Sequence, residues 1–251
     1  MKIFKWFIRP EDLFRMKNFY LLNVTAEVTN DIETDDNENF WKYRNLDEIR
    51  ERLMNKYQIS QETFVVLYTA DLLMGAARVA WLLHWIGCKN VRILIGAIDS
   101  SWSIPRPLSS GRLPKTPERS ETRLICSDLF EEFSSPTTRF IDVRTYAEYS
   151  GLITGYPFVR YAGRIPYFQF DRLNGIYGNI EGTISWNDLE KYLRWMSQTN
   201  VRTTDVRRIV YMCGTGWRAS LSAIFADVLE LAEVITVLDS GWYEWSEKYL
   251  K

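Results

Sequence analysis

The chain has few residues of the types that bind metals or form disulfides. Its 251 residues include one histidine and three cysteines, which are His84, Cys88, Cys126 and Cys213. The cysteines are odd in number and far apart, so their spacing fits neither a disulfide framework nor a zinc site. Cys88 and Cys126 are expected to be structural, and His84, within an apolar predicted helix, is expected to lie in a core or an interface. We therefore predict no metal, no cofactor and a reducing compartment.

The sequence also lacks long apolar runs and an excess of charge of either sign. Its longest apolar stretches are far too short to span a bilayer. The first ten residues lack a long apolar core and a small-residue cleavage site, so we predict no signal peptide and a cytoplasmic protein, with a periplasmic location open if an upstream segment is missing. Charged residues make up 25% of the chain, and the formal net charge is −1. That balance argues against a nucleic-acid partner and against binding at a membrane surface.

Proline is scarce and unevenly placed. Four of the eight prolines fall between positions 105 and 117, in a stretch without apolar periodicity. That composition is typical of a linker. Hydrophobic residues make up 46% of the chain, which is enough for a core on each side of the linker. We predict one domain in residues 1–104, a linker in residues 105–120 and a second domain in residues 121–251.

The two predicted domains share an order of elements. Predicted strands at 63–68 and 208–212 are each followed by a helix, at 76–86 and from 219, and by a further strand, at 91–95 and 234–238. If Thr69 is matched to Cys213, the further strand begins 91 − 69 = 22 residues later in one half and 234 − 213 = 21 residues later in the other. Strands at 19–24 and 140–144 and helices at 45–53 and 187–195 also occupy matching places. The pattern indicates an internal duplication and predicts an α/β fold, with a mostly parallel sheet flanked by helices in each domain.

One segment combines a cysteine, two glycines and an arginine between a predicted strand and a predicted helix. It runs Cys213-Gly214-Thr215-Gly216-Trp217-Arg218. We expect the glycines to let the backbone curl around the sulfur, and the N-terminus of the helix to point at it. Backbone N–H groups and the helix dipole favour an anion there, so we expect a reactive thiolate at Cys213 rather than a structural cysteine. Arg144 also follows a predicted strand and would share the edge of the sheet where ligands gather.

On these residues the chain resembles the rhodaneses, sulfurtransferases of the thiosulfate and mercaptopyruvate class. Ile141-Asp142-Val143-Arg144 resembles the family's strand that ends in Asp-x-Arg. Ala162-Gly163-Arg164-Ile165-Pro166 resembles its Gly-His-Ile-Pro segment, and Asp239-Ser240-Gly241-Trp242 resembles its final Gly-Gly-Trp turn. The Cys213 loop is similar to that of multidomain bacterial thiosulfate sulfurtransferases. Tandem rhodaneses commonly pair a silent N-terminal domain with an active C-terminal one. The first half has Thr69 in place of the cysteine and Asn23-Val24-Thr25 in place of Asp-x-Arg, so the resemblance implies that the first half is catalytically silent.

The resemblance implies a two-step sulfur transfer at Cys213. The thiolate takes the outer sulfur of a small anionic donor such as thiosulfate, sulfite leaves, and the persulfide passes its sulfur to a thiol, cyanide or protein acceptor. Backbone N–H groups of residues 214–219 would stabilise the sulfur. The expected substrate-binding residues are Arg218 first and Arg144 second, for the charge of the donor, with Trp217, Gly214, Thr215 and Gly216. Arg164 and Trp242 are further candidates, and Asp142 is expected to orient the loop.

Other interpretations of the same residues stay open. Mercaptopyruvate is an alternative donor, although that class tends to have a less basic loop than Trp217-Arg218. A non-enzymatic persulfide carrier or interaction module is a second alternative. Cysteine phosphatases need five residues between the cysteine and the arginine, and here only four separate Cys213 from Arg218. Arg144 is as easily read as the partner of Asp142 or Glu148 in an ion pair, and the two tryptophans as packing residues.

Overall fold

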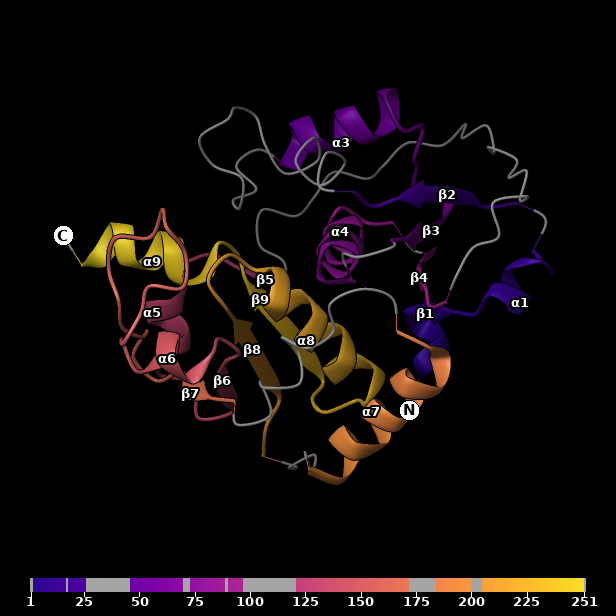
Figure 1. The fold of residues 1–251 in the computed structure, drawn as a ribbon. Coiled ribbons are helices and arrows are strands. Elements are labelled where there is room, and N and C mark those ends of the chain that lie inside the picture. The colour runs from indigo at the N-terminus through magenta and orange to yellow at the C-terminus, as the bar shows by residue number, and fades with distance from the viewer. Residues whose placement is uncertain are drawn as a thin grey trace. The chain divides into compact units, whose positions relative to one another are not determined.

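The computed structural model describes residues 2–16, 18–25, 46–69, 73–88, 90–96, 121–171, 184–199 and 205–250. The chain forms two compact units, Met1–Glu118 with Ile180–Thr199, and Arg119–Asn179 with Asn200–Lys251. Each unit contains a parallel sheet flanked by helices (Figure 1). The predicted α/β fold is therefore confirmed. The predicted linker at 105–120 lies outside the described residues, and the predicted domain boundaries stay a prediction.

The sheet of the first unit has the strand order β1-β4-β3-β2, with every pair parallel. Its elements are η1 (Ile3–Lys5), β1 (Phe7–Ile8), α1 (Pro10–Leu13), β2 (Tyr20–Asn23), α3 (Leu46–Asn55), β3 (Phe64–Tyr68), α4 (Leu73–Trp85) and β4 (Asn90–Leu94). Val65, Val66 and Leu67 in the middle of β3 have no exposed surface. A strand with consecutive buried residues is covered on both faces, as expected for a parallel sheet between helices.

The sheet of the second unit has the order β5-β9-β8-β6-β7, again with every pair parallel. Its elements are β5 (Arg123–Leu124), α5 (Leu129–Glu132), β6 (Thr138–Asp142), α6 (Tyr146–Tyr149), β7 (Gln169–Phe170), β8 (Arg208–Met212), α8 (Trp217–Val228), β9 (Val234–Leu238) and α9 (Gly241–Tyr249). The order β5-β9-β8-β6 corresponds to β1-β4-β3-β2. That correspondence is what a duplicated strand–helix–strand plan would produce.

Helix α7 (Trp186–Thr199) follows β7 in the sequence but groups with the first unit. The Trp186 ring stacks on Phe4 with ring centroids 5.4 Å apart, and the Arg9 guanidinium lies 4.5 Å from the centre of the Trp186 ring. Arg9 also pairs with Glu190 at 3.4 Å. These partners lie near the start of the chain, whereas the sequence assigned the helix to the second domain; that assignment stays a prediction.

The core of the second unit lies beneath the carboxyl ends of its central strands. Met212 from β8, Leu238 from β9 and the aromatic residues Trp242 and Trp245 from α9 are buried together there.

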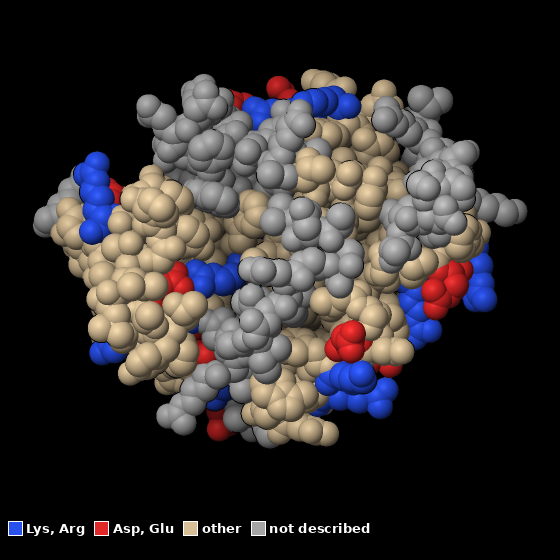
Figure 2. All heavy atoms as spheres, in the orientation of Figure 1, with Lys and Arg blue, Asp and Glu red and all other residues tan. Residues whose placement is uncertain are grey.

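On the face that Figure 2 draws, acidic and basic side chains lie beside one another in small groups rather than in patches of one sign. Among the described residues, no helix is long and apolar enough to cross a membrane.

Candidate active site

The Cys213 loop connects the end of β8 to the start of α8, as predicted. Gly216 adopts φ +95°, a left-handed conformation that glycine tolerates at low cost, and it forms the N-cap of α8. The loop thereby turns back on itself, and the Gly216 N–H donates to Cys213 Sγ at 3.1 Å. This contact is one of the expected backbone donors to the sulfur. Cys213 has no exposed surface.

The N-terminus of α9 holds the other side of this loop. The Trp242 N–H donates to the Cys213 carbonyl oxygen at 2.9 Å, and the Tyr243 N–H donates to the Gly214 carbonyl oxygen at 3.0 Å. Gly241 has φ +49°, and a Cβ atom added there would lie 2.1 Å from the Cys213 carbonyl oxygen. Only glycine fits so close to the loop. The turn from Asp239 to Trp242 therefore fixes the direction of the Cys213 and Gly214 carbonyl groups.

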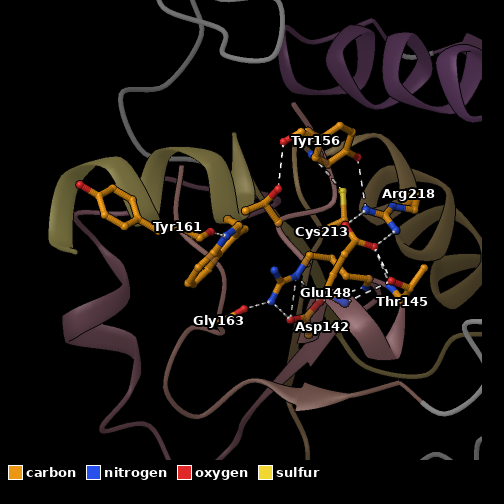
Figure 3. Close-up of polar contacts among 12 residues, drawn as sticks. Asp142, Thr145, Glu148, Tyr156, Tyr161, Gly163, Cys213 and Arg218 are labelled. Carbon is orange, nitrogen blue, oxygen red and sulfur yellow. Dashed lines mark hydrogen bonds and ion pairs between the residues drawn. The ribbon is translucent and has the colours of Figure 1, made fainter. Parts of the chain in front are cut away.

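Arg218 lies in the first turn of α8 and forms a two-pronged ion pair with Glu148. Arg218 Nη1 donates to Glu148 Oε2 and Nη2 donates to Oε1, both at 2.8 Å (Figure 3). The side chains are 15% and 4% exposed, so little water reaches the pair. Burial by itself would lower the pKa of Arg218, but the hydrogen bond to Glu148 and the charges of Tyr156, Cys213 and Glu148 raise it. The sequence did not predict a carboxylate partner for Arg218.

Glu148 is fixed by its own helix as well as by Arg218. Helix α6 begins with a capping box, in which the N–H and Oγ1 of Thr145 donate to Glu148 Oε2 at 2.9 and 2.8 Å. Burial alone would raise the pKa of Glu148, but Arg218 and the Thr145 hydrogen bonds lower it to about 2. The carboxylate is therefore charged at neutral pH. The sequence pattern Thr-x-x-Glu is a capping-box signal and offered a way to anticipate this placement.

Tyr156 is a further residue of the site that sequence reasoning missed. Its hydroxyl accepts a hydrogen bond from Arg218 Nη2 at 3.2 Å. A Cβ atom added at Gly214 would lie 2.1 Å from Tyr156 Cε2, so the ring rests directly against the loop. Burial raises the pKa of Tyr156, and the charges of Cys213 and Glu148 raise it further while Arg218 opposes them. The phenol is thus neutral at physiological pH.

Asp142 and Arg144 form a second buried ion pair at the end of β6. Neither side chain has exposed surface, and Arg144 Nη2 donates to Asp142 Oδ2 at 2.7 Å and to the Gly163 carbonyl oxygen at 2.8 Å. The Arg144 guanidinium also lies 4.8 Å from the centre of the Trp242 ring. The alternative in which Arg144 pairs with Asp142 is therefore observed, and Glu148 instead pairs with Arg218. A role for Arg144 in substrate binding stays a prediction.

The remaining predicted residues have different surroundings. Trp242 is 1% exposed, and its Nε1 donates to the Tyr161 carbonyl oxygen at 2.9 Å, which makes it part of the core. Arg164 is exposed, with its guanidinium 5.2 Å from the centre of the Tyr149 ring. Thr215 is buried within the loop, and Trp217 is half-buried at the start of α8. Within the described part of the chain, no group of His, Cys, Asp and Glu residues is arranged to hold a metal ion.

The other two cysteines lie in the cores, as expected. Cys126 is fully buried, and its sulfur lies 3.8 Å from the Gly241 carbonyl oxygen. Cys88 is 2% exposed, and burial raises the pKa of its thiol to about 12. Neither of these two cysteines is in a disulfide in the part of the chain that the structure describes. A thiol with so high a pKa carries almost no thiolate at neutral pH, so Cys88 is chemically quiet.

The chain is similar to proteins of known family and to a curated sequence. Residues 127–248 match the model of the rhodanese-like domain. Over 234 residues the chain is 26% identical to the thiosulfate sulfurtransferase YnjE of Escherichia coli (strain K12). The matched region covers 87% of this chain and 52% of YnjE, so the chain spans about half the length of that curated relative.

Solved structures share the fold over nearly the whole chain. A persulfide form of EanB with ergothioneine matches with a TM-score of 0.76 at 20% identity, over 99% of this chain and 70% of EanB. An anaerobic ergothioneine biosynthesis enzyme from Chlorobium limicola, in complex with trimethyl histidine, matches with a TM-score of 0.73 at 21% identity, over 98% of this chain and 69% of that enzyme. At these identities the likeness establishes the fold.

Proposed function

Because residues 127–248 match the model of the rhodanese-like domain, we propose that the chain is a sulfurtransferase that carries sulfur on Cys213. The observation that carries this proposal is the loop itself. It places the Cys213 sulfur after a parallel strand and ahead of helix α8, with the Gly216 N–H donating to it at 3.1 Å. Cysteines at such positions act as nucleophiles because backbone donors stabilise the charge on sulfur.

The proposed reaction has two sulfur transfers. In the first, the Cys213 thiolate attacks the outer sulfur of thiosulfate; a new S–S bond forms, the S–S bond of the donor breaks, and sulfite leaves with its electron pair. In the second, an acceptor such as a cellular thiolate, cyanide or a protein thiol attacks the terminal persulfide sulfur and restores the thiolate. No outside oxidant is needed, because sulfur is exchanged between the two partners. Loop N–H groups stabilise the charged sulfur in both steps.

The relatives support this proposal for the donor and for the intermediate. YnjE is a thiosulfate sulfurtransferase by name, and EanB has been solved with a persulfide on a cysteine.

Thr69 in the first unit follows β3, at the place that Cys213 takes after β8, so we propose that the first unit does not catalyse.

The test is the intact mass of the purified, reduced protein after incubation with thiosulfate. The parent protein is expected to gain one sulfur, about thirty-two mass units, and Cys213→Ala to gain none. Cys88→Ala and Cys126→Ala serve as matched controls and should gain sulfur like the parent. No gain with thiosulfate, but a gain with mercaptopyruvate, would contradict the donor. Loading of a control cysteine in place of Cys213 would contradict the site.

A further inference from the structure

The arginine of the Cys213 loop is held by a carboxylate, and this has a consequence for the donor. The two terminal nitrogens of Arg218 each donate to one oxygen of Glu148, and Nη2 also donates to the Tyr156 hydroxyl. The end of the guanidinium formed by Nη1 and Nη2, one of its two edges that can bind an oxyanion in a two-pronged manner, is therefore occupied by Glu148. Figure 3 shows this pair next to the Cys213 side chain.

The carboxylate cannot easily be set aside. It is 4% exposed, it accepts two hydrogen bonds from Thr145, and a Cβ atom added at Gly155 would lie 2.2 Å from Glu148 Oε1. The surroundings thus close around it from three sides. The other arginine beside the loop, Arg144, is neutralised in the same way by Asp142. The two arginines expected to receive an anion are therefore both paired with carboxylates.

We propose that Glu148 is a specificity-determining residue: by neutralising Arg218 it disfavours donors with two negative charges and favours donors with one. The inference rests on the proposed sulfur transfer at Cys213. A thiosulfonate of the form R–SO2–S⁻ belongs to the favoured class. Its transfer balances as that of thiosulfate does: the thiolate forms a bond to the outer sulfur, the S–S bond breaks, and a sulfinate R–SO2⁻ leaves with the electron pair.

The charges in the site influence one another, which supports the proposal. The pKa of Arg218 is raised by Glu148 and by Cys213, and that of Tyr156 is raised by Cys213 and Glu148 besides its burial. The carboxylate and the sulfur therefore act on the same two neighbours. We therefore expect removal of the negative charge of Glu148 to strengthen binding of a second negative charge on the donor, on the order of tenfold at the effective dielectric of a partly buried site.

The experiment compares Glu148→Gln with the parent protein on two donors, thiosulfate and methanethiosulfonate. The quantity measured is the ratio of kcat/KM for thiosulfate to that for methanethiosulfonate, because the intrinsic reactivity of each donor cancels between variants. The ratio is expected to rise about tenfold in Glu148→Gln. Glu148→Asp keeps the charge, and Thr145→Ala keeps both charges while loosening the carboxylate. Both control variants should retain the parent ratio even where their rates fall.

A ratio that is unchanged or falls in Glu148→Gln would overturn the proposal. Arg218 would then bind the doubly charged donor itself, and Glu148 would only hold Arg218 in place. A rise of the same size in Glu148→Asp would overturn it too, since geometry rather than charge would be responsible. Alkylation of Cys213 provides a readout that needs no sulfur transfer. The ratio of its rate with iodoacetate to that with iodoacetamide should also rise in Glu148→Gln. If that ratio rises while neither donor loads Cys213 of the parent, the charge assignment holds and the proposed function fails.

Discussion

The close contact between Gly241 and the Cys213 carbonyl oxygen predicts the effect of one added methyl group. In Gly241→Ala, the new Cβ atom would lie 2.1 Å from that oxygen and 3.0 Å from the Cys213 carbonyl carbon. Both atoms belong to buried backbone, so no flexible side chain can move aside. The N-terminus of α9 must therefore shift away from the loop. That shift would break the hydrogen bonds from the Trp242 and Tyr243 N–H groups to the Cys213 and Gly214 carbonyls.

The expected cost follows from these contacts. Holding alanine at φ +49° costs about 1 kcal/mol relative to glycine. Leaving two buried carbonyl groups without their donors costs about 1–2 kcal/mol each. We therefore expect the free energy of unfolding of Gly241→Ala to fall by about 3–5 kcal/mol. The variant should also load sulfur on Cys213 more slowly, because the loop loses the support that orients its N–H groups.

Urea unfolding, followed by circular dichroism, measures this loss, and Gly151→Ala is the matched control. Gly151 has φ +80°, but its added Cβ would meet no atom closer than 3.4 Å, so the control contains the backbone cost without the overlap. It should lose only about 1 kcal/mol. If Gly241→Ala is no less stable than Gly151→Ala, the reasoning that α9 holds the Cys213 loop through this contact is refuted.

Two further predictions concern titratable groups. The pKa of Glu148 is lowered in the folded state from 4.5 to about 2. Its contribution of about 3 kcal/mol to the free energy of unfolding is therefore present in full above pH ~4.5 and declines as the pH falls towards 2. Urea unfolding at pH 7, 5, 4 and 3 should show the stability of the parent protein approaching that of Glu148→Gln, and a difference that widens as the pH falls would contradict this. Burial raises the pKa of Cys88 to about 12, so Cys88 in the folded protein should resist iodoacetamide at pH 8, while the same residue in the urea-unfolded chain should react fully. Peptide mapping by mass spectrometry checks this. Alkylation of Cys88 at equal rates in both states would show that the thiol is not buried.

The sequence predicted the elements whose signal is local. Strands β8 and β9 lie at 208–212 and 234–238 as expected, and α8 begins two residues before its predicted start at 219. These segments are continuous apolar runs bounded by glycines or polar residues, so their period and length settle the assignment. The position of the Cys213 loop between them followed directly.

The contacts of the site were harder to predict because they join distant segments. Glu148 and Arg218 are 70 positions apart in the sequence, and nothing local in the sequence shows that their side chains meet. Tyr156 has the same difficulty, since only the packing of its ring against Gly214 reveals its place. Charge alone left Arg144 free to pair with Asp142 or Glu148. The folded chain settles this through the capping box at Thr145, which directs Glu148 towards α8.

The placement of α7 affects the order in which the chain can fold. Arg9 pairs with Glu190 of this helix, and the two residues are 181 positions apart in the sequence. The apolar side of α7, formed by Leu189, Leu193 and Met196, is buried in the folded protein. During synthesis, the first unit therefore waits for a helix that is made after β6 and β7 of the second. The two units are interleaved along the chain, and a single cut between them would separate α7 from the residues at the start of the chain that hold it.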